Sequence, residues 1–481
     1  MAAILAIDQG TSGTKAVVSG EDGAILATAE EPVRPDYLPG DGVEVDPEAL
    51  WQSVVVAGRR ALAEAGVAVD AVALANQGET VLAWDRATGD PLTRAVVWQD
   101  GRSKTVTDRL AASADGVADE VATRTGLVLD PYFSAPKMRW IRDEWTTDGV
   151  VTTTDAWLVH RLCGAYVTDS STASRSLALA VDEVRWDDEL LELFGLGGED
   201  LPRVVASDEV VGTTTVFGPE VPVAGLIVDQ QAALLAQSCL EAGSAKCTYG
   251  TGAFLLANVG ERAVRSTTGL TTSVAWTLRD RTAYCLDGQV YTAASAVRWL
   301  VDLGVLEKAT DVDRVAGAEP RGVLCVPSFA GAAAPWWRSD ATASLTGLTL
   351  ASGRAEVVRA VLDGIAAQVA VLMGSVEGDL GRSLSVLRVD GGLTHSRVLM
   401  QAQSDLAQTP VELYPGAHAT ALGAAAAARL ALDPGLSAAE AVGAWQPERV
   451  YTPDWSADRA TAFLAAWTGA LEAGLPDRAP A

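Results

Sequence analysis

ILAIDQGTSGTKAVV, residues 4–18, decides how the rest of the chain is interpreted. The apolar run from Ile4 to Ile7 predicts a buried strand, and a second strand begins at Ala16 after a turn of small residues. Glycines and hydroxyls in that turn would let backbone N–H groups approach phosphate oxygens. The turn matches neither a Walker A loop nor GxGxxG, which disfavours the P-loop and Rossmann folds. An ordinary glycine-rich hairpin is the alternative interpretation.

The second half of the chain repeats this order of a strand and a glycine-rich turn. Residues 245–249 lead into Gly250-Thr251-Gly252, and residues 385–389 run into Asp390-Gly391-Gly392. Two such halves predict a duplicated α/β unit, and a length of 481 residues also favours two domains. We place the two domains at residues 1–242 and 243–474, with a frayed tail over 475–481.

Two carboxylates are predicted at strand ends, where open α/β sheets bind their ligands. Asp229 follows the apolar strand of residues 223–228 and could take the proton from an attacking hydroxyl. Local sequence alone favours a different role, because Asp is also a preferred helix N-cap. Asp8 ends the first strand and could hold Mg²⁺, directly or through water.

Acidic side chains beside aromatic ones suggest a site for a polyol. Such groups occur at Gln77-Gly78-Glu79, at Trp98-Gln99-Asp100 and at residues 130–133, which read DPYF. Carboxylates accept hydrogen bonds from hydroxyls, and ring faces cover C–H surfaces. Because the chain has 14 Trp, a single Trp is more often part of the core than of a ligand site.

Composition narrows the partners and the location. A formal net charge of −26 disfavours nucleic acid and anionic membranes as partners. Five widely spaced cysteines without CxxC fit reduced thiols in a cytoplasmic protein, and three scattered histidines do not suit a zinc site. The N-terminal apolar run meets Asp8 at once, so we expect no signal peptide, and we find no uncharged apolar run long enough to span a membrane.

Taken together, these motifs resemble the glycerol kinase branch of the FGGY carbohydrate kinase family. The resemblance runs from Ile4 to about Ala428. Its most specific stretches are NQGET (76–80), VVWQ (96–99), DPYFS (130–134), TDAWL (154–158), DQQAAL (229–234), TYGTG (248–252) and VDGG (389–392). The resemblance implies two ribonuclease-H-like domains, as in actin and hexokinase, with a cleft between them. It also implies that ATP lies mainly on the C-terminal domain and the acceptor mainly on the N-terminal one.

The resemblance further assigns roles to individual residues. Asp229 would be the general base, and Mg²⁺ would bridge the phosphates with Asp8 in its outer environment. The acceptor site would comprise Gly78, Glu79, Trp98, Tyr132, Asp229, Gln230 and Phe254. The nucleotide site would comprise Thr11, Ser12, Gly13, Lys15, Gly250, Thr251, Ala294, Arg298, Gly392 and Ser396.

The chain also departs from the glycerol kinase pattern. Glycerol kinases carry Arg where this chain has Gly78 and Lys15, and they usually carry Gly, Gln and Asn where it has Ala294, Arg298 and Ser396. At Gly78 the missing side chain would have donated to acceptor hydroxyls beside Glu79. Either the pocket is enlarged, which slightly favours an acceptor larger than glycerol, or another cation such as Arg102 reaches in.

Three functions therefore stay open. Glycerol is the best single acceptor, and a tetritol, a pentitol or a xylulose-like ketose is the nearest alternative. A non-catalytic, actin-like protein that binds partners according to its nucleotide is the alternative of another class. As for oligomeric state, the chain is a candidate homodimer.

Some glycerol kinases bind a sugar bisphosphate, or are phosphorylated on a histidine, just before the catalytic strand. Residues 211–222 contain neither Arg nor His, so we expect neither control.

Overall fold

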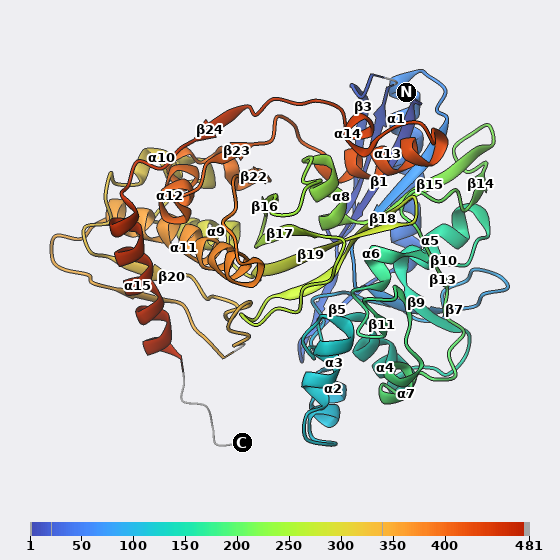
Figure 1. Ribbon diagram of the computed structural model, residues 1–481, viewed down its shortest axis with the longest axis horizontal. Coiled ribbons are helices and arrows are strands. Elements are labelled where there is room, and N and C mark those ends of the chain that lie inside the picture. The colour runs from blue at the N-terminus through green and yellow to red at the C-terminus, as the bar shows by residue number, and fades with distance from the viewer. Residues whose placement is uncertain (1, 21, 339, 476–481) are drawn as a thin grey trace.

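The computed structural model describes residues 2–20, 22–338 and 340–475 (Figure 1). The N-terminal half, blue to green in Figure 1, and the C-terminal half, yellow to red, each contain a large mixed sheet. The part of the predicted tail beyond Leu475 lies outside the described residues.

The first large sheet has six strands in the order β14-β15-β6-β1-β2-β3. They are β1 (Ile4–Gly10), β2 (Gly13–Ser19), β3 (Ile25–Pro32), β6 (Ala71–Asn76), β14 (Gly212–Thr214) and β15 (Val221–Val228). β1, β2 and β3 form an antiparallel meander, and β6 and β15 add to β1 in parallel. The hairpin predicted from residues 4–18 is therefore confirmed as β1 and β2.

The second large sheet repeats this topology in the order β18-β19-β17-β16-β22-β23-β24. Its strands are β16 (Ala245–Tyr249), β17 (Ala253–Gly260), β18 (Thr271–Leu278), β19 (Arg281–Val290), β22 (Leu387–Asp390), β23 (Val411–Leu413) and β24 (Arg449–Tyr451). β16, β17 and β19 are antiparallel, and β22 and β23 add to β16 in parallel. The predicted duplicated α/β unit is thus confirmed.

A smaller five-stranded sheet in the N-terminal half carries much of the polar sequence singled out above. Its order is β4 (Asp36–Leu38), β5 (Gly42–Val45), β8 (Ala95–Val96), β7 (Val81–Trp84) and β9 (Val150–Thr153). Three two-stranded pairs complete the strands: β10 (Val167–Asp169) with β13 (Arg203–Val205), β11 (Leu179–Ala180) with β12 (Arg185–Trp186), and β20 (Leu324–Val326) with β21 (Ser344–Thr346).

Helices cover the sheets, and their ends follow sequence rules. The N-terminal half has α1 (Pro47–Ala65), α2 (Lys104–Ala111), α3 (Val117–Thr125), α4 (Ser134–Glu144), α5 (Thr154–Cys163), α6 (Ser170–Ala173), α7 (Asp188–Leu193) and α8 (Asp229–Ala236). The C-terminal half has α9 (Ala294–Asp302), α10 (Val312–Val315), α11 (Arg354–Leu380), α12 (Arg397–Ala407), α13 (Ala419–Leu432), α14 (Ala438–Val442) and α15 (Ala457–Gly474), with 3₁₀ turns at Ala309–Asp311 and Gly392–His395. α1 begins at Pro47 because Asp46 accepts from Glu48 N and Pro47 suits the first turn.

α13 belongs to the C-terminal half of the chain but packs on the first sheet, beside the blue strands in Figure 1. The approach is close: a Cβ on Gly225 of β15 would lie 2.4 Å from Ala424 O, and one on Gly423 would lie 1.9 Å from Ala232 O of α8. Arg429 fixes the helix by donating to Ser19 Oγ at 2.5 Å and to Gly20 O at 2.9 Å. A division of the chain near residue 243 stays a prediction, since one hydrophobic core crosses it.

α11 is long and apolar enough to cross a membrane by length and composition alone. In the structure 83% of the most apolar 18-residue stretch of this helix is buried inside the protein, as expected for a central core helix. It packs against β17, β19 and β20 of the C-terminal half.

Candidate active site

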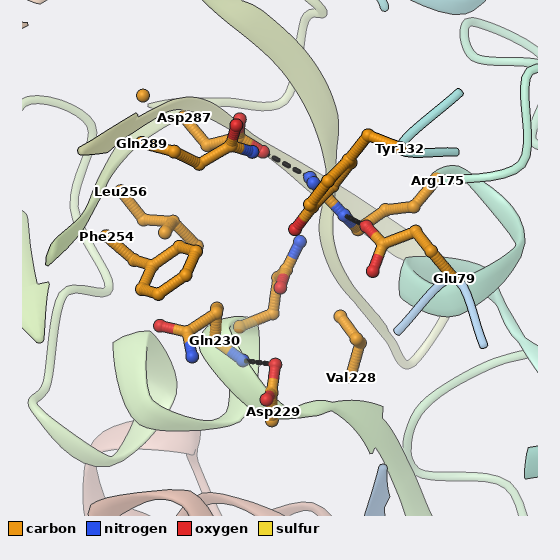
Figure 2. A pocket seen from close by; sticks show the side chains of 12 residues that line it. Glu79, Tyr132, Arg175, Val228, Asp229, Gln230, Phe254, Leu256, Asp287 and Gln289 are labelled. Carbon is orange, nitrogen blue, oxygen red and sulfur yellow. Dashed lines mark hydrogen bonds and ion pairs between the residues drawn. The ribbon is translucent and has the colours of Figure 1, made fainter. Parts of the chain in front are cut away.

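A polar pocket lies where the two halves meet (Figure 2). It contains about 310 Å³ of empty space, including its open mouth. The lining residues are Glu79, Tyr132, Arg175, Val228, Asp229, Gln230, Gln231, Phe254, Leu256, Asp287, Gly288 and Gln289. Both large sheets contribute, because β6 and β15 end at one wall while β17 and β19 form the other.

The structure brings together most of the predicted acceptor residues. Glu79, Tyr132, Asp229, Gln230 and Phe254 all line the pocket. Trp98 lies beside it, edge-on to Tyr132 with ring centroids 5.6 Å apart and to Phe254 at 6.4 Å. Gly78 is buried next to Glu79, and a Cβ added there would lie 3.0 Å from Val228 Cγ2. The missing side chain at this position therefore does not leave an open channel.

Arg175 is a pocket residue that the sequence did not reveal. Its side chain is buried, its Nε donates to Glu79 Oε1, and its Nη1 donates to Asp287 Oδ2. Figure 2 shows both interactions as dashed lines. Arg102, which we considered as a cation near Glu79, instead pairs with Asp100 and Glu44. No motif or spacing singled out Arg175, because its partners are distant in sequence.

Asp229 is the first residue of α8, and Val228 is the N-cap. The N-cap role that local sequence favoured for Asp229 is therefore wrong. The Asp229 carboxylate accepts a 2.6 Å hydrogen bond from Gln230 N, and burial raises its pKa while the Lys246 ammonium opposes that rise. A carboxylate with few intramolecular partners, at the wall of a pocket, is available to accept a proton from a ligand.

Lys246 of β16 is a second residue that the sequence did not reveal. It is fully buried and donates to Gln230 Oε1 at 2.6 Å and to Thr248 Oγ1 at 2.9 Å. Thr248 in turn donates to Asp390 Oδ1 at 2.6 Å. This chain of hydrogen bonds links the Asp229 end of the pocket to the glycine turn after β22.

Asp8 has a strongly perturbed environment at the predicted metal position. Burial raises its pKa to about 7, and the neighbouring charges of Asp229, Glu30 and Asp390 add to the rise while Lys15 opposes it. An acidic neighbourhood of this kind suits a cation. Among the described residues no three His, Cys, Asp or Glu side chains form a metal site, so a metal would need further ligands from a substrate or from water.

The glycine turns divide into tightly packed and open positions. A Cβ on Gly13 would lie 2.8 Å from Glu31 O, and one on Gly391 would lie 2.4 Å from Tyr249 O. By contrast, a Cβ on Gly392 would meet no atom within 4 Å, and Gly250 is almost as open. Thr11 of the first turn accepts a 2.8 Å hydrogen bond from Trp98 Nε1, which connects this turn to the acceptor residues. Ser12, Gly13 and Thr251 are at least partly exposed, and so is Lys15.

The remaining predicted nucleotide residues lie on α9 and at the start of α12. α9 begins at Ala294, whose N–H donates to Gly250 O at 3.1 Å, and Arg298 is exposed on this helix. Ser396 is the N-cap of α12, and its hydroxyl donates to Asp313 Oδ1 at 2.5 Å. The Ser396 hydroxyl is therefore already engaged inside the protein.

Comparisons with known proteins agree with this arrangement. The N-terminal domain model of the FGGY family of carbohydrate kinases matches residues 3–236, and the C-terminal domain model matches residues 245–432. The chain therefore belongs to this family, and the protein is a carbohydrate kinase with the FGGY two-domain α/β fold.

Individual relatives refine the comparison. The chain is 44% identical to the glycerol kinase of Alkalilimnicola ehrlichii over 451 residues, or 90% of each chain. It is 40% identical to that of Symbiobacterium thermophilum over 487 residues, covering 98% of this chain and 97% of the relative. The structure of Plasmodium falciparum glycerol kinase with ADP superposes with a TM-score of 0.93 at 30% identity, covering 99% and 98% of the two chains.

Proposed function

We propose that this protein transfers the terminal phosphoryl group of ATP to glycerol and forms glycerol 3-phosphate. One observation carries the proposal: Asp229, Glu79 and Tyr132 converge on one polar pocket in a chain 44% identical to a glycerol kinase. Family membership already argues against the non-catalytic alternative. The acceptor itself is argued from the residues that line the pocket.

Asp229 acts as the general base in this proposal. A hydroxyl is a poor nucleophile, and its proton passes to the Asp229 carboxylate as the oxygen attacks phosphorus. Burial, which raises the pKa of this carboxyl, makes it a better proton acceptor than an ordinary surface aspartate. Gln230 N donates to the base, and Lys246 of the C-terminal half in turn donates to the Gln230 side chain.

Acceptor hydroxyls bind the carboxylate of Glu79, and the aromatic group of Trp98, Tyr132 and Phe254 covers the carbon chain. The ring of Trp98 joins the other two, with centroids 5.6 Å from Tyr132 and 6.4 Å from Phe254. This combination of one acidic wall and one aromatic wall suits a small polyol.

ATP binds along the glycine turns. The proposed contacts are Thr11, Ser12, Gly13, Lys15, Gly250 and Thr251 at the phosphates, and Ala294, Arg298, Gly392 and Ser396 at the adenosine. The open space beside Gly250 and Gly392 supports backbone approach to the nucleotide. Since the hydroxyl of Ser396 is bonded to Asp313, we propose that Ser396 contacts the adenosine through packing rather than through a hydrogen bond. Mg²⁺, for which the environment of Asp8 is suited, would neutralise charge on the phosphates when bound.

A larger polyol or a ketose is the second candidate, because Gly78 lacks the side chain expected there. The structure supports this candidate less than it supports glycerol, since a Cβ added to Gly78 would lie 3.0 Å from Val228 Cγ2.

We also propose a soluble, cytoplasmic enzyme whose partners are small molecules rather than nucleic acid or membrane. The homodimer stays a prediction.

An assay of ADP release with Mg-ATP over glycerol, erythritol, xylitol and D-xylulose tests the function. We expect the highest kcat/KM with glycerol, and ³¹P NMR should identify glycerol 3-phosphate as the product. A higher kcat/KM on another acceptor would replace glycerol by that compound. If none of these acceptors stimulates ADP release, the kinase assignment is contradicted.

A further inference from the structure

The acceptor pocket contains one basic residue among its described lining residues, and that residue is Arg175. Its carboxylates are Glu79, Asp229 and Asp287. A cation is needed there to balance buried negative charge and to donate hydrogen bonds to hydroxyl oxygens. Gly78, where glycerol kinases carry the Arg, supplies neither.

The stem of Arg175 lies beside the place that a side chain at residue 78 would occupy. A Cβ built on Gly78 would be 4.0 Å from Arg175 Cδ. The guanidinium also lies over the Tyr132 and Phe133 rings, with Cζ 5.7 and 5.6 Å from their centroids. Arg175 therefore reaches the same corner of the pocket from a different part of the chain.

Two polar atoms in this corner are left for a ligand. Nε and Nη1 of Arg175 are used by Glu79 and Asp287, but within the described chain no hydrogen bond is made by Arg175 Nη2 or by Glu79 Oε2. A donor and an acceptor side by side match a hydroxyl, which accepts and donates at once. On the wall formed by β19, Gln289 Oε1 is buried without a hydrogen-bond partner among the described residues, which again points to a hydroxyl donor.

Asp287 fixes the guanidinium from the opposite half of the molecule. It is buried on β19 and is itself held by the Thr271 hydroxyl, while Glu79 follows β6 of the first sheet. Arg175 thus joins a carboxylate from each half. Its position in the pocket depends on both.

We propose that Arg175 is a specificity-determining residue that binds an acceptor hydroxyl together with Glu79, and that Asp287 is the residue that positions it. This inference rests on the proposed polyol kinase function. It assigns to Arg175 the donor role that Gly78 cannot fill.

The test uses the full-length enzyme and the acceptor on which the wild type is most active. Hydrogen bonds from a charged donor contribute ~1.5–3 kcal/mol, so we expect Arg175→Gln to raise the acceptor KM about 10- to 150-fold. The KM for ATP should change less than about threefold. This second measurement distinguishes a loss specific to the acceptor from a merely structural defect, which would affect both substrates. Asp287→Asn should raise the acceptor KM by a smaller factor with kcat less affected.

Arg142→Gln is the matched control. Arg142 pairs with Glu199, and its side chain is 7% exposed, as is that of Arg175, but it does not line the pocket. We expect its acceptor KM to stay within about twofold of wild type. If Arg175→Gln does not fold, Arg175→Lys carries the test, because a lysine cannot reproduce the forked donors and should raise the KM.

The outcomes separate the two proposals. A wild type that is inactive on every acceptor in the panel refutes the proposed function and this inference with it. An active wild type whose folded Arg175 variants keep the acceptor KM within threefold refutes the inference alone. An equal rise in KM for Arg142→Gln also refutes it, since the effect would then be general destabilisation.

Discussion

Replacing Asp229 by asparagine removes the proposed base while keeping the shape of the side chain and its hydrogen bond with Gln230. The amide oxygen of Asn can accept the 2.6 Å hydrogen bond from Gln230 N as the carboxylate does. Loss of a general base typically costs ~10²–10⁴-fold in rate. We therefore expect kcat to fall by that factor, with the KM for ATP nearly unchanged because the glycine turns are untouched.

The stability of the Asp229→Asn variant gives a second readout, which we do not expect to fall as kcat does. Burial raises the pKa of Asp229 in the folded state, so the ionised carboxylate is disfavoured there relative to the unfolded chain. Asparagine has no such charge, and we expect the variant to be at least as stable as wild type at pH 8. A low kcat together with an unchanged or higher Tm cannot be attributed to misfolding.

The assay is ADP release under saturating glycerol and Mg-ATP, with Tm measured on the same samples. Asp188→Asn is the control, because Asp188 is likewise the first residue of a helix, α7, but is exposed and away from the pocket. It should retain wild-type kcat. A folded Asp229→Asn protein with kcat within threefold of wild type would remove Asp229 from the role of base.

Three other predictions concern the pocket rim, pH and regulation. Gly78→Arg should not improve kcat/KM on glycerol by more than about threefold, because Val228 crowds the new side chain at 3.0 Å and Arg175 already pairs with Glu79. A tenfold gain on glycerol, compared with erythritol and xylitol in the same assay, would contradict this. Asp8, with a folded pKa of about 7 against the ordinary aspartate value of 3.8, holds a proton in the folded state that the unfolded chain releases. Stability from this group therefore falls as pH rises from about 4 to 7, and between pH 5.5 and 8 the wild type should lose up to about 2 kcal/mol relative to Asp8→Asn. Urea unfolding without Mg²⁺ or nucleotide measures this difference, and a value independent of pH would refute it. Fructose 1,6-bisphosphate should not inhibit at saturating ATP, because residues 211–222 lack Arg and the adjacent Arg59 already donates Nε and Nη2 to Val216 O. Inhibition that persists under those conditions would show that another anion site exists.

Local sequence patterns predicted the elements whose signals are themselves local. The hairpin at residues 4–18 was predicted because its apolar runs and its turn are contiguous. The start of α1 has a similarly local signal, because Asp46 and Pro47 are adjacent in the sequence.

The acceptor pocket was predicted in part. Glu79, Tyr132, Asp229, Gln230 and Phe254 were found through motifs that resemble a family, and the pocket gathers all five. Their roles stay predictions until they are tested.

Arg175 and Asp287 were missed because each acquires its meaning from a partner far away in the chain. Arg175 pairs with Glu79, which is 96 positions away in the chain, and with Asp287, which is 112 positions away. Buried charges of this kind have no periodicity or motif of their own. They are recognisable only once the two sheets are placed against each other.

The packing of α13 on the first sheet also affects how the chain folds during synthesis. Roughly 190 residues separate Val228, the end of β15, from Ala419, the start of the helix that covers it. At ~5–20 residues per second, the ribosome needs about 10–40 s to make that stretch. Throughout this interval the nascent first sheet lacks its covering helix and exposes apolar surface. One face of the first sheet is thus completed only after most of the C-terminal half has been made, when α13 packs on it.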